Sequence, residues 1–232
     1  MSTPRPAETR HAESRERLLD AAERLFADRG YAAASVRDIT SAARCNVAAV
    51  NYYFGGKDNL YREVFRRGLA SLRTRRVDSI RRTMAGAPGG ATLESLIEGF
   101  ASAFLAPAAT PGDGGRLIEL MAREWLEPHL PRDVFQDELV GPVREALSEA
   151  IEETCPGLDR TRARQCVQSI VAQLVQVIHH RRLFGTFGEW ARAPVRLEEV
   201  ASHIVRFSAA GTRACARGSR RGKARPASAR PR

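Results

Sequence analysis

The fold of this chain is decided by residues 35–60, which read SVRDITSAARCNVAAVNYYFGGKDNL. Ser35 can cap a short helix, because its hydroxyl can accept an otherwise unpaired backbone N–H. Apolar residues then recur with helical spacing on one face, at Val36, Ile39 and Ala43. Residues 44–46 break this pattern, and Asn46 can cap a second short helix. The stretch therefore predicts two short helices around a tight turn, followed by the start of a longer helix.

The second of these helices has two faces of different character. Val50 and Phe54 lie four residues apart and must face inward. The residues that then point outward are small, polar or aromatic, namely Ala48, Ala49, Asn51 and Tyr52, with Lys57 just beyond them. A short helix with such a face, braced by a helix before it, suits the major groove of DNA.

The stretch resembles the N-terminal helix-turn-helix of the tetracycline-repressor (TetR) family of bacterial transcription regulators. The resemblance covers residues 15–69 and rests on the segments LLDAAERLFADRGY (18–31), SVRDI (35–39) and VNYYFGGKDNL (50–60). Two positions depart from the family pattern. Arg44 stands where the family usually has Gly, and a left-handed residue at this turn would be unfavourable for Arg. Asn51 stands where Tyr is common, so the family's base contacts are not transferred to it.

The candidate base contacts are Arg37, Asn51 and Tyr52. Arg37 can donate two hydrogen bonds to guanine, and Asn51 can pair with adenine. Three small apolar residues would lie close to the groove floor, namely Val47, Ala48 and Ala49. Tyr53 and Lys57 would hold phosphates and so set the register of the protein on the duplex.

The net charge of +10 is unevenly distributed along the 232 residues. Residues 15–76 carry 13 basic and 7 acidic side chains, whereas residues 77–210 carry 14 basic and 18 acidic ones. Residues 211–232 carry 8 basic side chains and no acidic one. This segregation is typical of a nucleic-acid-binding module joined to a module that does not touch nucleic acid.

The composition also bears on the compartment. No run of 18 apolar residues occurs, so we expect neither a transmembrane helix nor a membrane partner. The N-terminal residues have none of the features of a signal peptide. Four cysteines are scattered without a Cys-x-x-Cys motif, at Cys45, Cys155, Cys166 and Cys215. Ordinary buried thiols in a reducing compartment fit this pattern, so we expect a cytoplasmic, nucleoid-associated protein.

The rest of the chain predicts an all-α protein of about nine helices, because no strand-like alternation occurs. We expect four regions: a flexible arm over 1–14, a helix-turn-helix domain over 15–69, a ligand-binding and dimerisation domain over 70–210, and a disordered basic tail over 211–232. Within the third region we expect a loop over 107–115 and a kink at Pro142. The tail has no periodic apolar face, so it is either a solubilising appendage or a sequence-independent DNA contact.

The TetR resemblance implies what the third region does. In this family the last two long helices of each subunit commonly form a four-helix dimer interface, and wide apolar stripes over 159–183 and 197–207 fit that role. Two recognition helices in a two-fold dimer read a palindromic operator. The resemblance also implies a pocket for an unknown small-molecule effector among the middle helices. Candidate lining residues are Phe100, Phe104, Met121, Trp125, His129 and Phe135.

Enzymatic motifs are missing from the sequence. It contains no G-x-S-x-G, P-loop, H-E-x-x-H or Gly-rich dinucleotide loop, so we expect neither catalytic residues nor a cofactor. Because His179 and His180 are adjacent on a helix, they point about 100° apart, and we expect no metal site. The prediction is therefore a ligand-released transcriptional repressor. Two alternatives remain open, a non-specific basic DNA-packaging protein and a small-molecule-binding protein without regulatory DNA binding.

Overall fold

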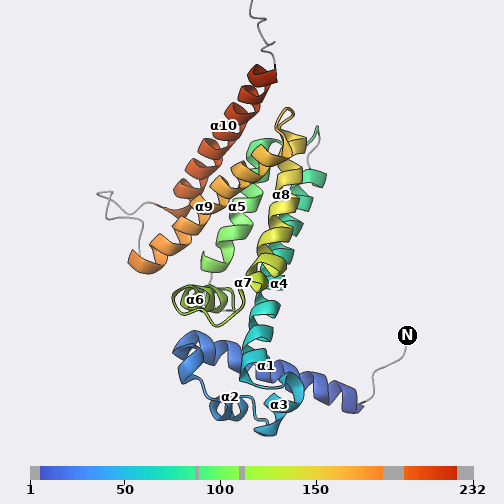
Figure 1. Ribbon diagram of the computed structural model, residues 1–232, viewed down its shortest axis with the longest axis vertical. Coiled ribbons are helices and arrows are strands. Elements are labelled where there is room, and N and C mark those ends of the chain that lie inside the picture. Colours follow the sequence, from blue (N-terminus) through green and yellow to red (C-terminus); the bar gives the residue numbers. More distant parts are fainter. Residues whose placement is uncertain (1–5, 87–88, 110–112, 185–195, 224–232) are drawn as a thin grey trace, which may run out of the picture. The chain divides into compact units, whose positions relative to one another are not determined.

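The computed structural model describes residues 6–86, 89–109, 113–184 and 196–223, and the regular structure in these ranges is entirely helical (Figure 1). The helices are α1 (Pro6–Ala33), α2 (Val36–Ala42), α3 (Ala48–Phe54), α4 (Lys57–Gly86), α5 (Leu93–Ala109), α6 (Asp113–Leu126), α7 (Arg132–Phe135), the π-helical η1 (Gln136–Val140), α8 (Gly141–Thr154), α9 (Arg160–Phe184) and α10 (Leu197–Lys223). Since α7, η1 and α8 follow one another without a break, the described residues form nine helical segments, of which α1 is kinked at the non-helical Gly30 (φ 80°, ψ 170°). The predicted all-α class is confirmed.

The chain divides into two compact units, and the division falls inside α4. Unit 1 comprises residues 1–71 and 107–139, and unit 2 comprises residues 72–106 and 140–232. The predicted helix-turn-helix domain lies wholly in unit 1, but α6 and α7 belong to the same unit. The polar contacts that hold α6 there are described with the candidate interface below.

Unit 1 is built around the apolar faces that the sequence predicts. Fully buried side chains on α1, α2, α3 and α4 include Leu18, Phe26, Ile39, Val50, Leu60 and Phe65, and α6 adds Leu120. Burying each such side chain contributes about 1.5–3 kcal/mol of transfer free energy. This core fixes α2 and α3, which are too short to be stable alone, against two longer helices.

Unit 2 is a helical bundle in which α9 packs against both α8 and α10. Its core includes Leu96 and Phe100 on α5, Leu147 on α8, and Leu174 on α9. The close approach of α4 and α5 depends on Gly99, because a Cβ atom there would lie 2.6 Å from Oγ1 of Thr83 on α4. None of the helices in the described ranges is long and apolar enough to cross a membrane.

Both ends of the chain are more helical than the sequence predicted. Residues 6–14, expected as part of a flexible arm, form the first turns of α1. Pro6 suits the first position of a helix, and the Ala and Glu residues after it have high helix propensity. Residues 1–5 lie outside the described residues.

The predicted disordered tail is also wrong for residues 211–223, which continue α10. Thr212 and Ala216 lie one turn apart and are buried, and Arg213 forms an ion pair with Glu94 of α5. The apolar face persists here in small residues, which a search for large periodic side chains overlooks. Residues 224–232 lie outside the described residues.

The structure differs from two further expectations about the middle helices. In the predicted loop over 107–115, residues 107–109 end α5 and residues 113–115 begin α6. The kink expected at Pro142 takes the form of the π-helical segment η1 just before it. Pro142 has no N–H to donate to the preceding turn, and a π turn accommodates such a break in the hydrogen-bond ladder.

Candidate nucleic-acid interface

The start of α2 has the cap that the sequence predicts. The Asp38 backbone N–H donates to Oγ of Ser35 at 3.1 Å, and the Ser35 backbone N–H donates to Oδ2 of Asp38 at 3.3 Å. The two residues thus form a reciprocal capping box. Hydrogen bonds from Ser35 hold the pKa of the Asp38 carboxyl below its usual value. This cap fixes the first turn of α2, on which Arg37 is exposed.

The turn between α2 and α3 is strained in the way the sequence predicts. Arg44 has φ of 53° and is the one non-glycine residue with positive φ among the described residues. Such a conformation costs roughly 1–2 kcal/mol for a residue with a Cβ atom. The Cys45 backbone N–H donates to the Thr40 carbonyl oxygen at 2.9 Å, and Nε of Arg17 donates to the Ala43 carbonyl oxygen at 3.2 Å. These contacts hold the strained turn in place.

Helix α3 is oriented as expected, but its N-cap position is Val47, which makes no side-chain cap bond, and the predicted cap residue Asn46 bonds from the turn just before it. Oδ1 of Asn46 accepts the Ala48 backbone N–H at 2.9 Å. Val50 and Phe54 are buried, and Gly55 ends the helix in the left-handed conformation with φ of 74°. The buried pair fixes the rotation of α3 about its axis, so the opposite face is available to a partner.

The predicted DNA-contacting residues lie mainly on that available face. Arg37, Ala48 and Asn51 are exposed, while Val47 is 49% and Tyr52 73% exposed. Ala49, Tyr53 and Lys57 are half-buried. Tyr52 on α3 and Val47 just before it give this surface both hydrogen-bonding and apolar groups.

One residue near this face was missed by the sequence analysis. His11, on the first turns of α1, has its ring centroid 6.3 Å from those of both Tyr52 and Tyr53. The two tyrosine rings themselves meet edge to face at 4.9 Å. The helix-start signal at Pro6 could have placed His11 on α1, but its approach to α3 depends on how the helices pack.

Lys57 is held more tightly than a simple phosphate contact requires. Its Nζ lies 4.3 Å from the centroid of the Tyr31 ring, a cation–π contact, and burial lowers the pKa of its ammonium group. The Tyr31 hydroxyl in turn donates to Asp58. Burial, and then the bond to Asp58, raise the pKa of Tyr31 to about 12.

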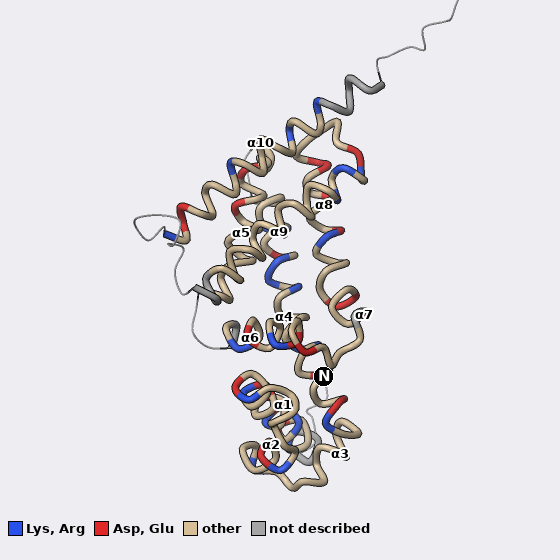
Figure 2. Tube along the Cα trace, turned by 60° about the vertical axis from the view of Figure 1, so that its left-hand side comes forward, with Lys and Arg blue, Asp and Glu red and all other residues tan. Residues whose placement is uncertain are grey.

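Many basic side chains of unit 1 are neutralised within the unit. Arg67 of α4 bonds to Asp20 at 2.7 Å and to Glu23 at 2.6 Å, both on α1. Arg15 pairs with Glu63 at 3.0 Å. Basic and acidic residues accordingly both occur along α1 (Figure 2). The positive charge counted in the sequence is therefore only partly available to a nucleic acid.

The C-terminal turn of α6 is fastened to the helix-turn-helix by two adjacent residues. Arg123 donates from Nε to the Ala27 carbonyl oxygen at 3.0 Å and from Nη2 to that of Asp28 at 3.2 Å, near the end of α1. Glu124 is 5% exposed and accepts the hydroxyl of Tyr61 on α4 at 2.9 Å. Its other oxygen accepts the backbone N–H groups of residues 129 and 130, each at 2.6 Å.

The six predicted ligand-contacting residues are divided between the two units. Phe100 and Phe104 are buried in unit 2, with ring centroids 5.8 Å apart. The other four lie in unit 1: Met121 is half-buried, Trp125 is 71% exposed, the His129 ring lies 4.4 Å from that of Tyr31, and the Phe135 ring lies 5.5 Å from that of Phe65. The six candidates therefore come from both units, and the pocket described next is lined by none of them.

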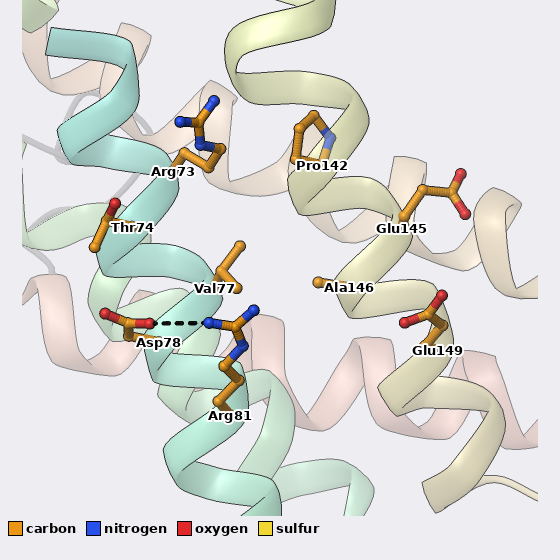
Figure 3. A pocket seen from close by; sticks show the side chains of 9 residues that line it. All are labelled: Arg73, Thr74, Val77, Asp78, Arg81, Pro142, Glu145, Ala146 and Glu149. Carbon is orange, nitrogen blue, oxygen red and sulfur yellow. Dashed lines mark ion pairs between the residues drawn. The ribbon is translucent and has the colours of Figure 1, made fainter. Parts of the chain in front are cut away.

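A pocket that the sequence did not predict lies within unit 2, between α4 and α8. Its volume is about 400 Å³ and its lining is Arg73, Thr74, Val77, Asp78, Arg81, Pro142, Glu145, Ala146 and Glu149. Val77 and Ala146 lie on its two walls, and Asp78 pairs with Arg81 at 3.6 Å (Figure 3). Charged residues of both signs dominate this pocket, which is the opposite of the apolar pocket expected. In the described ranges no cluster of His, Cys, Asp or Glu could hold a metal ion.

Comparison with known proteins covers both halves of the chain. The sequence model of bacterial regulatory proteins of the tetR family matches residues 18–64. The model of the C-terminal domain of the HTH-type transcriptional dual regulator CecR matches residues 93–212. The HTH-type transcriptional repressor KstR2 of Rhodococcus jostii is 35% identical over 97 residues, which is 41% of this chain and 46% of that protein. The chain thus matches less than half the length of this relative.

Solved structures share the fold. A transcriptional regulator from Pseudomonas aeruginosa matches with a TM-score of 0.66 and 21% identity, covering 94% of this chain and 95% of that one. A TetR-family regulator from Mesorhizobium loti matches with a TM-score of 0.65 and 14% identity, covering 88% of this chain and 97% of that one. At these identities the likeness establishes the fold alone.

Proposed function

Because the chain belongs to the TetR family of bacterial transcription regulators, we propose that it is a repressor that binds a palindromic operator as a homodimer and leaves it when a small molecule binds. The observation that carries the proposal is the outward face of α3. Its buried pair, Val50 and Phe54, leaves Asn51 and Tyr52 exposed on the opposite side. A helix held in this way can present its side chains to base edges in the major groove.

Each side chain on this surface has a distinct part in the proposal. Arg37 reads guanine, and Asn51 reads adenine beside Tyr52. The small residues Val47, Ala48 and Ala49 allow α3 to approach the groove floor. Tyr53 and Lys57 hold phosphates, with Lys57 exchanging part of its contact with Tyr31 for the phosphate.

The sharpest test replaces Arg37 and measures binding to an operator selected from random duplexes. Arg37→Ala should weaken operator binding by about 1–3 kcal/mol and relax the preference at one base pair. Arg24→Ala is the matched control, since it removes an exposed positive charge from α1 at a position that is not among the predicted DNA contacts. Equal weakening on all sequences would make Arg37 a phosphate contact and would contradict its assignment to a base.

The homodimer would form through α9 and α10. An exposed aromatic on α10 supports this, because Phe207 is 63% exposed while its neighbours Ser208 and Ala209 are buried in the bundle. Phe207→Glu should convert the dimer to a monomer in sedimentation equilibrium, whereas Ser202→Glu, at another exposed position of α10, should not. Dimers reading two half-sites would require a spacing of about 34–36 Å between recognition helices.

Release by a ligand requires a conformational preference. The ligand must bind one arrangement of the two recognition helices more tightly than another, since equal affinity for both shifts nothing. Two features support a mechanical link: α4 is shared by both units, and Arg123 and Glu124 fasten α6 to α1 and α4. The protein would act in the cytoplasm, at the nucleoid.

The two alternative functions give different results in one gel-shift experiment. The duplexes are a palindrome from the region upstream of its own gene and a scrambled version of it. A repressor binds the palindrome preferentially, a DNA-packaging protein binds both equally, and a ligand-binding protein without regulatory function binds neither. The family is regulatory rather than enzymatic, which favours the first outcome.

A further inference from the structure

Unit 2 buries an arginine that has no counter-ion among the described residues. Arg76 on α4 is 6% exposed, and its Nε is enclosed without any hydrogen-bond acceptor. Its guanidinium carbon lies 3.8 Å from the centroid of the Phe104 ring on α5. No carboxylate in the described ranges forms an ion pair with it, and burial alone is responsible for lowering its pKa to about 10. At neutral pH the side chain is therefore a buried cation.

A buried charge of this kind is costly unless something compensates it. Buried charges in proteins are normally paired and hydrogen-bonded, because removal from water without a partner opposes folding. The face of the Phe104 ring offsets part of this cost through a cation–π contact. The buried Nε–H has no acceptor, so at least this part of the hydrogen-bonding demand of Arg76 is unmet.

The groups around Arg76 indicate what kind of ligand could accept its hydrogen bonds. Phe104 covers one side of the guanidinium, and Phe100, one turn earlier on α5, brings a second buried ring within 5.8 Å of the first. The nearby hydroxyl of Ser79 is already used, since it donates to the Gly99 carbonyl oxygen at 2.7 Å. Among the described residues, the local groups thus combine a planar cation whose Nε lacks an acceptor with an aromatic wall, and none of them pairs with it as an anion.

We propose that Arg76 and Phe104 form the anion-recognising part of the effector site, and that the effector is an organic acid with an apolar body. A carboxylate would accept two parallel N–H bonds from the guanidinium, which is the strongest and most directional pairing open to arginine. The apolar body would lie against the Phe100 and Phe104 rings. This inference rests on the proposed ligand-released function and adds the chemical class of the ligand.

The mechanism of selectivity follows from the same contacts. A neutral molecule of the same shape could occupy the aromatic wall but would leave the guanidinium unpaired. An acid would neutralise the buried cation and supply its missing acceptors. Discrimination between an acid and its amide is therefore the signature of this site, and it should amount to about 10- to 100-fold in affinity.

The test uses the full-length protein without DNA and measures binding by calorimetry. The probes are 4-phenylbutanoate and decanoate, each compared with its own primary amide, and decyl phosphate distinguishes a carboxylate preference from a general anion preference. The wild-type protein should bind at least one acid about 10-fold or more tightly than its amide. Arg76→Met should abolish that difference, while Arg76→Lys, which keeps the charge but loses the planar fork, should keep part of it.

Arg75→Met is the matched control, because Arg75 is exposed on the adjacent position of α4 and should leave discrimination intact. A wild-type protein that does not distinguish any acid from its amide would overturn the proposal. So would an Arg76→Met variant that is folded by circular dichroism and still discriminates. Operator binding is measured separately on the same samples: loss of all sequence-specific DNA binding would refute the proposed function without affecting the calorimetric result.

Discussion

Glu124 in unit 1 and Arg76 in unit 2 are the two charged side chains buried in the described part of the chain, and they are accommodated in opposite ways. Three donors from α4 and the turn after α6 satisfy the Glu124 carboxylate. The Arg76 guanidinium lies against the face of the Phe104 ring, and its buried Nε has no acceptor. A fully satisfied buried charge fixes a structure, whereas an unsatisfied one retains binding energy that a ligand can use.

The difference corresponds to the two tasks in the proposed function. Arg123 bonds α6 to α1, and its neighbour Glu124 bonds α6 to α4. A movement of α6 would therefore displace α1 and α4 as well. Arg76 makes unit 2 responsive, because an anion bound there changes the charge balance of the bundle. Substitutions at the two positions should therefore change the free energy of unfolding in opposite directions.

The largest effect is expected for Glu124→Ala. The change leaves the Tyr61 hydroxyl and two backbone N–H groups without an acceptor, and each unsatisfied buried donor costs about 1–3 kcal/mol. With partial relief by water, the free energy of unfolding should fall by roughly 3–5 kcal/mol in urea titrations. Glu127→Ala, at an exposed position one turn on, should change it by less than about 0.5 kcal/mol. Equal effects of the two changes would contradict a structural role for Glu124.

The opposite sign is expected for Arg76→Met. Burial lowers the pKa of Arg76 to about 10, below the usual value of a guanidinium, so folding disfavours the charged form of this side chain. Met fills similar space without a charge, but it forfeits a cation–π contact of up to about 2 kcal/mol. The free energy of unfolding should therefore stay constant or rise by up to about 2 kcal/mol at neutral pH. A loss of more than about 1 kcal/mol, beyond that of Arg75→Met, would mean that the native fold supplies a partner for Arg76.

A smaller loss is expected for Arg123→Ala. Its guanidinium donates to two carbonyl oxygens near the end of α1, where unpaired carbonyl groups favour a positive charge. Because the side chain is exposed, the loss should be about 1–2 kcal/mol in the same urea titrations. Arg24→Ala on α1 serves again as the control. A loss equal to that of Glu124→Ala would show that both residues support the attachment of α6 equally.

The sequence predicted what depends on local spacing. Ser35 caps α2, Arg44 has positive φ, and α3 exposes Asn51 and Tyr52, because each of these follows from a few neighbouring residues. The DNA contacts themselves stay predictions. What the sequence did not predict depends on contacts between distant segments: the attachment of α6 to unit 1, the approach of His11 to Tyr52 and the isolation of Arg76.

The exposure of Trp125 is another feature that depends on contacts between distant segments. The sequence predicted Trp125 as a candidate lining residue of the effector pocket, yet its indole is 71% exposed while the next residue back, Glu124, is buried. Burial of Glu124 turns that face of α6 inward, and it is favourable only because Tyr61 and two backbone groups are positioned to bond it. Hydrophobic periodicity does not predict a buried carboxylate, one of whose donors, the Tyr61 hydroxyl, lies 63 residues away along the chain.

The smallest effect concerns the titration of Tyr31, which lies beside the satisfied network of unit 1. Its pKa of about 12 exceeds the usual 10.0, first because of burial and then because of Asp58. A phenol with a raised pKa in the folded state contributes stability that is complete below pH 10 and is lost as the pH rises towards 12. Asp58→Asn should lower the pKa of Tyr31 but leave it above 10, since burial remains.

The phenolate absorbance of Asp58→Asn, with Tyr31→Phe as the assignment reference, measures this change. Asp28→Asn, which removes an exposed carboxylate from α1, should leave the Tyr31 titration unchanged. If Asp58→Asn also leaves it unchanged, the hydrogen bond from Tyr31 to Asp58 does not persist in solution, and Lys57 would then be held by the ring alone.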